Sequence, residues 1–225
     1  MRFKIRRIIA ITLIFIGILI VFFPYTSNEI TKRQMQVKIN EFVEMSKQEE
    51  KFDSLYYKLK EYNELLYENG QELIDVFSYQ DVKVSLAEYG YIENIIGSIN
   101  IPKINIELPI YLGATDENLY RGACHLSKTS FPIGGVNSNT VIAAHRGLIR
   151  NEMFKNIHKL EIGDELIITN LWEDLKYKVC DIKIVNPSDI SEVYIQENRD
   201  LVTLVTCHPY RINTHRYIVI CERVN

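Results

Sequence analysis

Three residues of this 225-residue chain have side chains that together could cleave a peptide bond: Cys207, His145 and Arg216. A thiol is a strong nucleophile only as a thiolate, and a nearby cation lowers its pKa. A histidine can take up the thiol proton and later give it to a leaving amine. A guanidinium keeps its charge and carries a fixed fork of donors that can stabilise an oxyanion. Together these three residue types describe acyl transfer through a thioester.

The stretch LVTLVTCHPYRINTHR, residues 201–216, predicts how two of the three side chains come together. Its first seven residues read as a strand, a proline stops that strand, and a second strand begins at His215. If the two strands form a hairpin, Cys207 and Arg216 lie at the same end of it. Because side chains alternate along a strand, His208 points away from Cys207 and His215 points away from Arg216. We therefore expect neither of these histidines to be the catalytic base.

His145 is the best remaining candidate for the base. It follows the apolar strand predicted at 140–144 and precedes a break in the pattern, where a polar side chain can emerge. Three other arginines are interpreted as surface charges, and one of them, Arg211, is also a candidate for lining the substrate groove. These arginines are Arg146, Arg211 and Arg223.

From Gly97 onward the pattern changes to short alternating segments separated by turn residues. Many short strands with few helices predict a mostly β domain, built as a closed or nearly closed β-barrel rather than a parallel α/β sheet. The predicted strands are 99–104, 141–144, 165–169, 176–185, 201–207 and 217–224, and the predicted short helices are 116–122 and 153–159.

Residues 1–25 predict a membrane anchor. An uncharged apolar run of sixteen residues, 8–23, follows four basic residues. The run is slightly shorter than the roughly 17–25 residues of a full span, but Pro24 and Tyr25 can lie at the membrane interface. Its bulky end favours an uncleaved anchor over a cleaved signal peptide, which needs small residues at the cleavage site. The basic flank then stays in the cytoplasm, and the rest of the chain is exported as a single-pass protein of the cell membrane.

Two regions separate the anchor from the barrel. Residues 26–69 show apolar positions at three- and four-residue steps and end at Asn69-Gly70, which predicts one or two amphipathic helices with a C-cap. These helices would pack on the following domain and space it from the membrane, with binding of a partner as the alternative. Residues 70–96 are interpreted as a linker or lid, and 97–225 as the catalytic domain.

Composition restricts the partners. A net charge of −3 argues against nucleic acid as the main partner, because phosphate binding favours a basic surface. The spacing of the cysteines and histidines fits no common zinc pattern, so no metal and no cofactor are expected. Besides Cys207, the cysteines are interpreted as small buried apolar residues: Cys124, Cys180 and Cys221.

Several strings from about residue 96 onward resemble the sortase family. TLVTC ends at Cys207, AAHRG contains His145, and Arg216 follows the cysteine by nine residues. More narrowly, PYxxNTHR, residues 209–216, resembles the class C sortases, which polymerise pilins. The similarity covers about residues 96–224 and includes IPKI at 101–104, LPIYLG at 108–113 and HLSKTSFPIGG at 125–135.

This resemblance implies a sortase-type closed eight-stranded β-barrel with Cys207, His145 and Arg216 at one end of a substrate groove. It implies cleavage of an LPxTG-like sorting signal and transfer of the acyl group to a lysine amine of a pilin subunit. The hydroxyl or the backbone of Thr206 is expected to help bind the acyl carbonyl. The implied partners are a pilin or another surface protein with a C-terminal sorting signal, together with the acceptor amine.

Two departures from the class C pattern leave alternatives open. Class C lids carry Asp-Pro-Phe or Asp-Pro-Trp, whereas this chain has Asp75-Val76-Phe77. We interpret this segment as a degenerate lid in which Asp75 pairs with Arg216 and Phe77 shields Cys207; an ordinary linker is the alternative. Class C enzymes also often carry a second membrane segment after the barrel, and none follows here before Asn225. A sortase that attaches surface proteins to a cell-wall precursor, or a non-catalytic exported scaffold, are therefore the other functions considered.

Overall fold

The computed structural model describes residues 2–47, 53–71, 86–89, 94–147 and 151–224. Two helices precede the β-rich part of the chain: α1 (Arg2–Ser46) and α2 (Asp53–Asn69). The strands are β1 (Ile95–Ile101), β2 (Ile106–Leu112), β3 (Ala123–His125), β4 (Ser138–Ala143), β5 (Glu165–Thr169), β6 (Asp174–Val185), β7 (Asp200–His208) and β8 (His215–Arg223). A short helix, α3 (Asp116–Arg121), and short 3₁₀ helices lie between them.

The eight strands close into a barrel in the order β1-β2-β3-β4-β7-β8-β6-β5. The closing pair is β1 with β5, which are antiparallel. At this seam the two backbones approach closely, because a Cβ at Gly97 would lie 2.6 Å from the carbonyl oxygen of Thr169. A glycine is therefore required there. The predicted mostly β fold with an eight-stranded barrel is confirmed.

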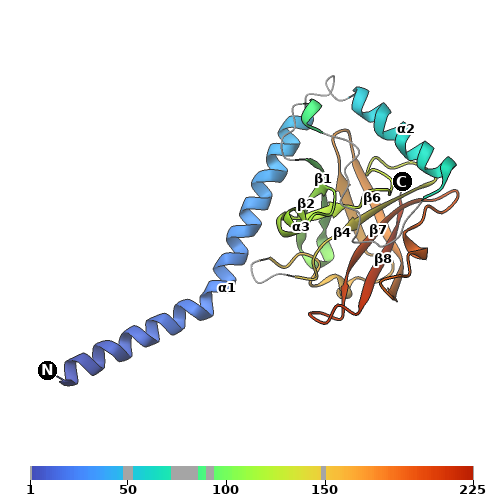
Figure 1. The fold of residues 1–225 in the computed structure, drawn as a ribbon. Helices are drawn as coiled ribbons and strands as arrows, with labels where there is room; N and C mark the ends of the chain where they lie inside the picture. The colour runs from blue at the N-terminus through green and yellow to red at the C-terminus, as the bar shows by residue number, and fades with distance from the viewer. Residues whose placement is uncertain (1, 48–52, 72–85, 90–93, 148–150, 225) are drawn as a thin grey trace.

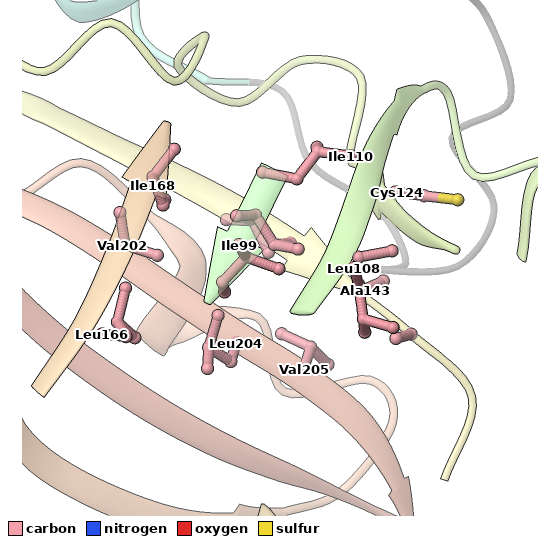
Figure 2. Packing of buried hydrophobic residues seen from close by; sticks show 14 of the residues in the cluster. Ile99, Leu108, Ile110, Cys124, Ala143, Leu166, Ile168, Val202, Leu204 and Val205 are labelled. Atoms are coloured by element: carbon pink, nitrogen blue, oxygen red, sulfur yellow. The ribbon is translucent and has the colours of Figure 1, made fainter. Parts of the chain in front are cut away.

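Apolar side chains fill the barrel, and most residues of its strands are buried. β4 is buried throughout, and β7 is buried from Leu201 to Thr206. Figure 2 shows side chains of β1, β5 and β7 gathered in the core, including Ile99, Ile168 and Leu204. Burial of this apolar surface holds the strand ends at fixed positions.

Both N-terminal helices, α1 and α2, pack against the barrel. Met35, Ile39 and Phe42 in the C-terminal part of α1 are buried, whereas the apolar N-terminal part is exposed and extends away from the barrel (Figure 1). α2 buries Leu55 and Leu59. The predicted end of the helical region at Asn69-Gly70 agrees with the structure, where Gly70 has a positive φ of 77°.

Several local predictions differ from the structure. α1 continues through Pro24, so the apolar segment and the first amphipathic segment form one helix. The predicted helix 153–159 is a series of turns that ends in a 3₁₀ helix, Ile157–Lys159. β1 starts at Ile95, before the predicted boundary at Gly97, and ends at Ile101, where Pro102 starts a 3₁₀ turn. Alternation does not reveal the strands β2 and β3, because their residues are nearly all buried.

Candidate active site

The β7–β8 hairpin brings Cys207 and Arg216 together. The two strands are antiparallel, and Cys207 and Arg216 are direct Cα partners in their register. Directly opposite residues of an antiparallel pair have their side chains on the same face, with Cβ atoms about 4.5–5.5 Å apart. Both residues are partly exposed, so a substrate can reach them. The predicted hairpin is confirmed.

His145 reaches the same end of the barrel through a parallel pair. β4 runs parallel to β7 with Ala143 opposite Val205, and the Ala144 N–H donates to the Val205 carbonyl at 3.2 Å. Continuing this register by two residues brings His145 level with Cys207. The strand itself ends at Ala143, so His145 lies just beyond it and is partly exposed, as the break in the sequence predicts.

Thr206 joins these two strands. Its side chain is fully buried, and its Oγ1 donates to the Ala144 carbonyl at 2.7 Å. The hydroxyl proton is therefore directed at the backbone beside His145 rather than at a substrate carbonyl, the partner that the resemblance implies. This hydrogen bond helps to hold the ends of β4 and β7 in register.

The guanidinium of Arg216 is oriented by the turn between the two strands. Its Nη1 donates to the carbonyls of Asn213 and His215, at 3.4 Å and 3.3 Å. Two carbonyl contacts on one nitrogen limit the rotation of the guanidinium. A positioned guanidinium can act on charge that develops near Cys207.

The interpretation of Arg146 as a surface charge is wrong. Its side chain is only 7% exposed, and its Nη1 donates to the Cys207 carbonyl at 3.3 Å and to Nδ1 of His208 at 3.5 Å. Its guanidinium carbon lies 5.0 Å from the ring centre of Tyr217. An arginine is ordinarily expected at the surface. In the sequence, only the position of Arg146 directly after His145 could have indicated that it lies at the site. Arg211 is exposed, whereas Arg223 is half-buried.

The short helix α3 covers His145. The Tyr120 ring packs edge-on against the imidazole, with ring centres 5.5 Å apart. Burial lowers the pKa of His145, and the charge of Asp116 partly offsets that effect. The imidazole is therefore mainly neutral at neutral pH, the form that can accept a proton.

The thiol of Cys207 is under opposing influences. Burial raises its pKa above the ordinary value, while the charges of Arg216 and Arg146 lower it. Since burial is the larger effect, the resting thiol keeps its proton at neutral pH. At neutral pH the thiolate therefore forms only if a base accepts the thiol proton.

The other histidines and thiols are placed differently. His208 continues β7 and lies near Arg146 and Tyr217, in keeping with its prediction as a poor base. Cys124 and Cys221 are buried, as predicted. The prediction that Cys180 is buried is wrong: it is half-buried at an irregularity of β6, and its Sγ accepts a hydrogen bond from Arg199. In the described part of the chain, no group of three or more metal-ligating side chains comes together.

The two predicted lid residues, Asp75 and Phe77, lie outside the residues that the structure describes. Their pairing with Arg216 and Cys207 remains a prediction.

Comparison with known proteins gives consistent matches. The sortase domain family matches residues 99–224. The chain is 31% identical over 131 residues to sortase D of Bacillus subtilis, an alignment that covers 57% of this chain and 63% of that protein. The chain thus spans less than two thirds of the length of this relative.

Solved structures match over more of the chain. Sortase C1 of GBS pilus island 1 is 34% identical with a TM-score of 0.77, covering 85% of this chain and 92% of that one. Sortase C of Streptococcus pneumoniae is 36% identical with a TM-score of 0.76, covering 83% of this chain and 96% of that one. The match of the family to more than half of the residues, together with the shared barrel, leads to one conclusion: the chain belongs to the sortase family of cysteine transpeptidases.

Proposed function

We propose that this protein is a membrane-anchored cysteine transpeptidase that cleaves an LPxTG-like sorting signal and joins the acyl fragment to a lysine amine of a pilin subunit. Cys207 is the nucleophile, His145 transfers the proton, and Arg216 stabilises the oxyanion. The observation that supports the proposal is the strand register, which pairs Cys207 of β7 with Arg216 of β8 and runs the end of β4, two residues before His145, alongside β7.

In the first half of the reaction, the Cys207 sulfur attacks the carbonyl carbon of the Thr–Gly bond after its proton passes to His145. The carbonyl oxygen becomes an oxyanion, and the Arg216 fork donates to it. As the carbon–nitrogen bond breaks, His145 gives its proton to the leaving amine. The product is a thioester between Cys207 and the threonine carbonyl.

In the second half, a lysine amine replaces the sulfur. The amine attacks the thioester carbonyl, an oxyanion forms again beside Arg216, and His145 takes the proton that the amine loses. The carbon–sulfur bond then breaks, and the proton returns to Cys207. An amide bond between threonine and lysine remains, and the enzyme is unchanged.

The similarity to sortase C structures supports a pilin as the substrate. The Streptococcus pneumoniae sortase C structure is described as giving insights into catalysis and pilin substrate specificity. The identity of 36% over 83% of this chain extends that similarity beyond the barrel core. The N-terminal helices are part of this coverage, because the matched barrel domain alone is shorter.

The test of the chemistry uses the full chain in detergent with a synthetic sorting-signal peptide. We expect mass spectrometry to detect an adduct of the threonine-ended fragment on Cys207 that hydroxylamine removes. Cys207→Ala abolishes the adduct. The matched control is Cys180→Ala, which removes the other partly exposed thiol and leaves the adduct unchanged. Absence of any adduct on the wild-type chain would favour a non-catalytic scaffold.

A second experiment identifies the acceptor. The full chain is incubated with a purified pilin that carries a sorting signal, and the products are separated under reducing conditions. A ladder of pilin multimers supports polymerisation through lysine amines. Attachment of the same pilin only to an added cell-wall precursor would instead identify an anchoring enzyme.

The membrane anchor rests on the exposed part of α1. Within the described residues, one helix is long and apolar enough to cross a membrane, and its apolar segment is not buried in the protein. We expect the basic flank in the cytoplasm and the barrel outside the cell. In a chain in which alanine replaces Cys180 and Cys207, an impermeant maleimide on intact cells should label Glu68→Cys but not Lys4→Cys. The reverse labelling would contradict this topology.

A further inference from the structure

Arg146 is a buried cation that has no carboxylate partner among the described residues. Its side chain is 7% exposed, and in the described part of the chain it takes part in no ion pair. Its Nε is buried and finds no hydrogen-bond partner among the same residues. Burying a charge without a counter-charge is unfavourable, so the other contacts of Arg146 must explain why an arginine is buried here.

The contacts of Arg146 join the segments that carry all three proposed catalytic residues. Arg146 directly follows His145 in the sequence. Its Nη1 donates to the backbone carbonyl of Cys207 at 3.3 Å. Its guanidinium carbon lies 5.0 Å from the ring centre of Tyr217, which directly follows Arg216. One side chain therefore contacts the end of β7 and the start of β8 from the end of β4.

These contacts use the properties that distinguish arginine from lysine. A planar guanidinium can stack on an aromatic ring and donate along its edge at the same time. The edge of Arg146 reaches Nδ1 of His208 at 3.5 Å as well as the Cys207 carbonyl. A lysine at this position would keep the charge but could not make both kinds of contact.

We propose that Arg146 is a positioning residue that fixes the end of β7, and with it the Cys207 side chain, relative to His145 and Arg216, by holding the Cys207 carbonyl from the face of the hairpin that carries His208 and Tyr217. This inference rests on the proposed function only in taking Cys207, His145 and Arg216 as the catalytic residues.

Two cations act on the Cys207 thiol. Arg216 and Arg146 both lower its pKa, and burial opposes them. Of the two cations, Arg146 has the smaller effect. Removal of the Arg146 charge should therefore raise the pH at which Cys207 becomes reactive.

The test compares Arg146→Gln and Arg146→Lys with a matched control at Arg223. Arg223 also lies over a tyrosine, with its guanidinium carbon 5.5 Å from the Tyr177 ring centre, and its Nη1 is buried without a hydrogen-bond partner among the described residues. It lies at the other end of β8, so Arg223→Gln imitates the packing loss without affecting the thiol. All variants are made in the full chain carrying Cys180→Ala.

Two measurements are made on each variant. The first is the rate of Cys207 alkylation by iodoacetamide as a function of pH, mapped by mass spectrometry and limited to conditions in which the chain is folded. The second is kcat and KM for acylation by the sorting-signal peptide. Alkylation requires no sorting signal, so it tests Arg146 even if the proposed transpeptidase activity is absent.

For Arg146→Gln, we expect the alkylation profile to move to higher pH by about half a unit, with the rate near neutral pH falling roughly threefold. For Arg146→Lys, we expect a smaller shift of the profile but a lower kcat at similar KM, because the charge remains and the positioning is lost. Arg223→Gln should change neither. If Arg146→Gln lowers thermal stability yet keeps the wild-type alkylation profile and kcat, Arg146 is only a packing residue and the inference is overturned.

Discussion

Replacement of His125 by glutamine should remove the part of the acid sensitivity of the barrel that comes from this buried ring. His125 ends β3, pairs with Ile142 of β4 and is 2% exposed. Its Nε2 lies 3.0 Å from the Ser130 carbonyl, and since a carbonyl only accepts, the neutral ring carries its proton on Nε2. A glutamine amide can make the same donation but does not titrate.

The magnitude follows from the pKa of the buried ring. Burial lowers the pKa of His125 from the ordinary 6.5 to about 4. Between these values the unfolded chain binds more protons than the folded chain, so the free energy of unfolding falls as the pH falls. The stabilisation is complete above pH 6.5 and is lost progressively towards pH 4. At ~1.4 kcal/mol per pH unit, the loss is roughly 3 kcal/mol.

The assay is urea unfolding of the full chain in detergent between pH 4 and pH 7. The single tryptophan, Trp172, reports the transition, because its half-buried ring packs against Tyr56 of α2. We expect the unfolding free energy of His125→Gln to depend less on pH than that of the wild type, by roughly 3 kcal/mol over this interval. Other titrating groups are common to both chains and cancel in the difference.

A control at an exposed histidine sharpens the comparison. His158 is exposed, so His158→Gln separates the effect of burying the His125 ring from the effect of removing any histidine. Equal slopes for the wild type and His125→Gln would refute the reasoning, because they would mean that the buried ring is protonated without cost.

Three further predictions concern the site and its support. Arg216→Lys keeps the charge but loses the fork, so kcat for acylation should fall on the order of 100-fold, and near-normal turnover would argue against the oxyanion role. Because burial raises the pKa of Cys207 above its ordinary 9.0, alkylation of the wild-type thiol should still accelerate beyond that pH, and a plateau near neutral pH would contradict the burial effect. Asn63→Ala should lower the unfolding free energy by roughly 2 kcal/mol, because the buried Asn63 side chain makes two hydrogen bonds with the backbone of Phe131. An unchanged urea midpoint would show that these bonds do not stabilise the docking of α2 on the barrel.

The parts of the site that depend on local sequence were predictable. Cys207 and Arg216 lie on strands joined by a short turn, so alternation and the position of the proline were enough to place them together. The same local reasoning excluded His208, which continues the strand beyond Cys207. The end of α2 also followed from the glycine after Asn69, and α3 lies within the helix predicted at 116–122.

Other features depend on long-range packing. His145 is level with Cys207 only because β4 and β7 pair in parallel, and residues 62 positions apart in the sequence hold that register. Parallel strands are joined by a long crossover connection, so no local pattern in the sequence predicts which strand pairs with β4 or in which register. Burial of Arg146 likewise depends on Tyr217 and the end of β7 arriving beside it.

The sequence by itself therefore determined the chemistry: a thiol, an imidazole and a guanidinium in segments whose alternation and turns predict strand ends. It also determined the mostly β class and the apolar N-terminal segment. Only the tertiary structure decided which backbones meet, that α1 continues through Pro24, and that Arg146 is buried against Cys207. The physical reason is that alternation and capping act between neighbouring residues, whereas burial is a property of the surfaces that the closed barrel brings together.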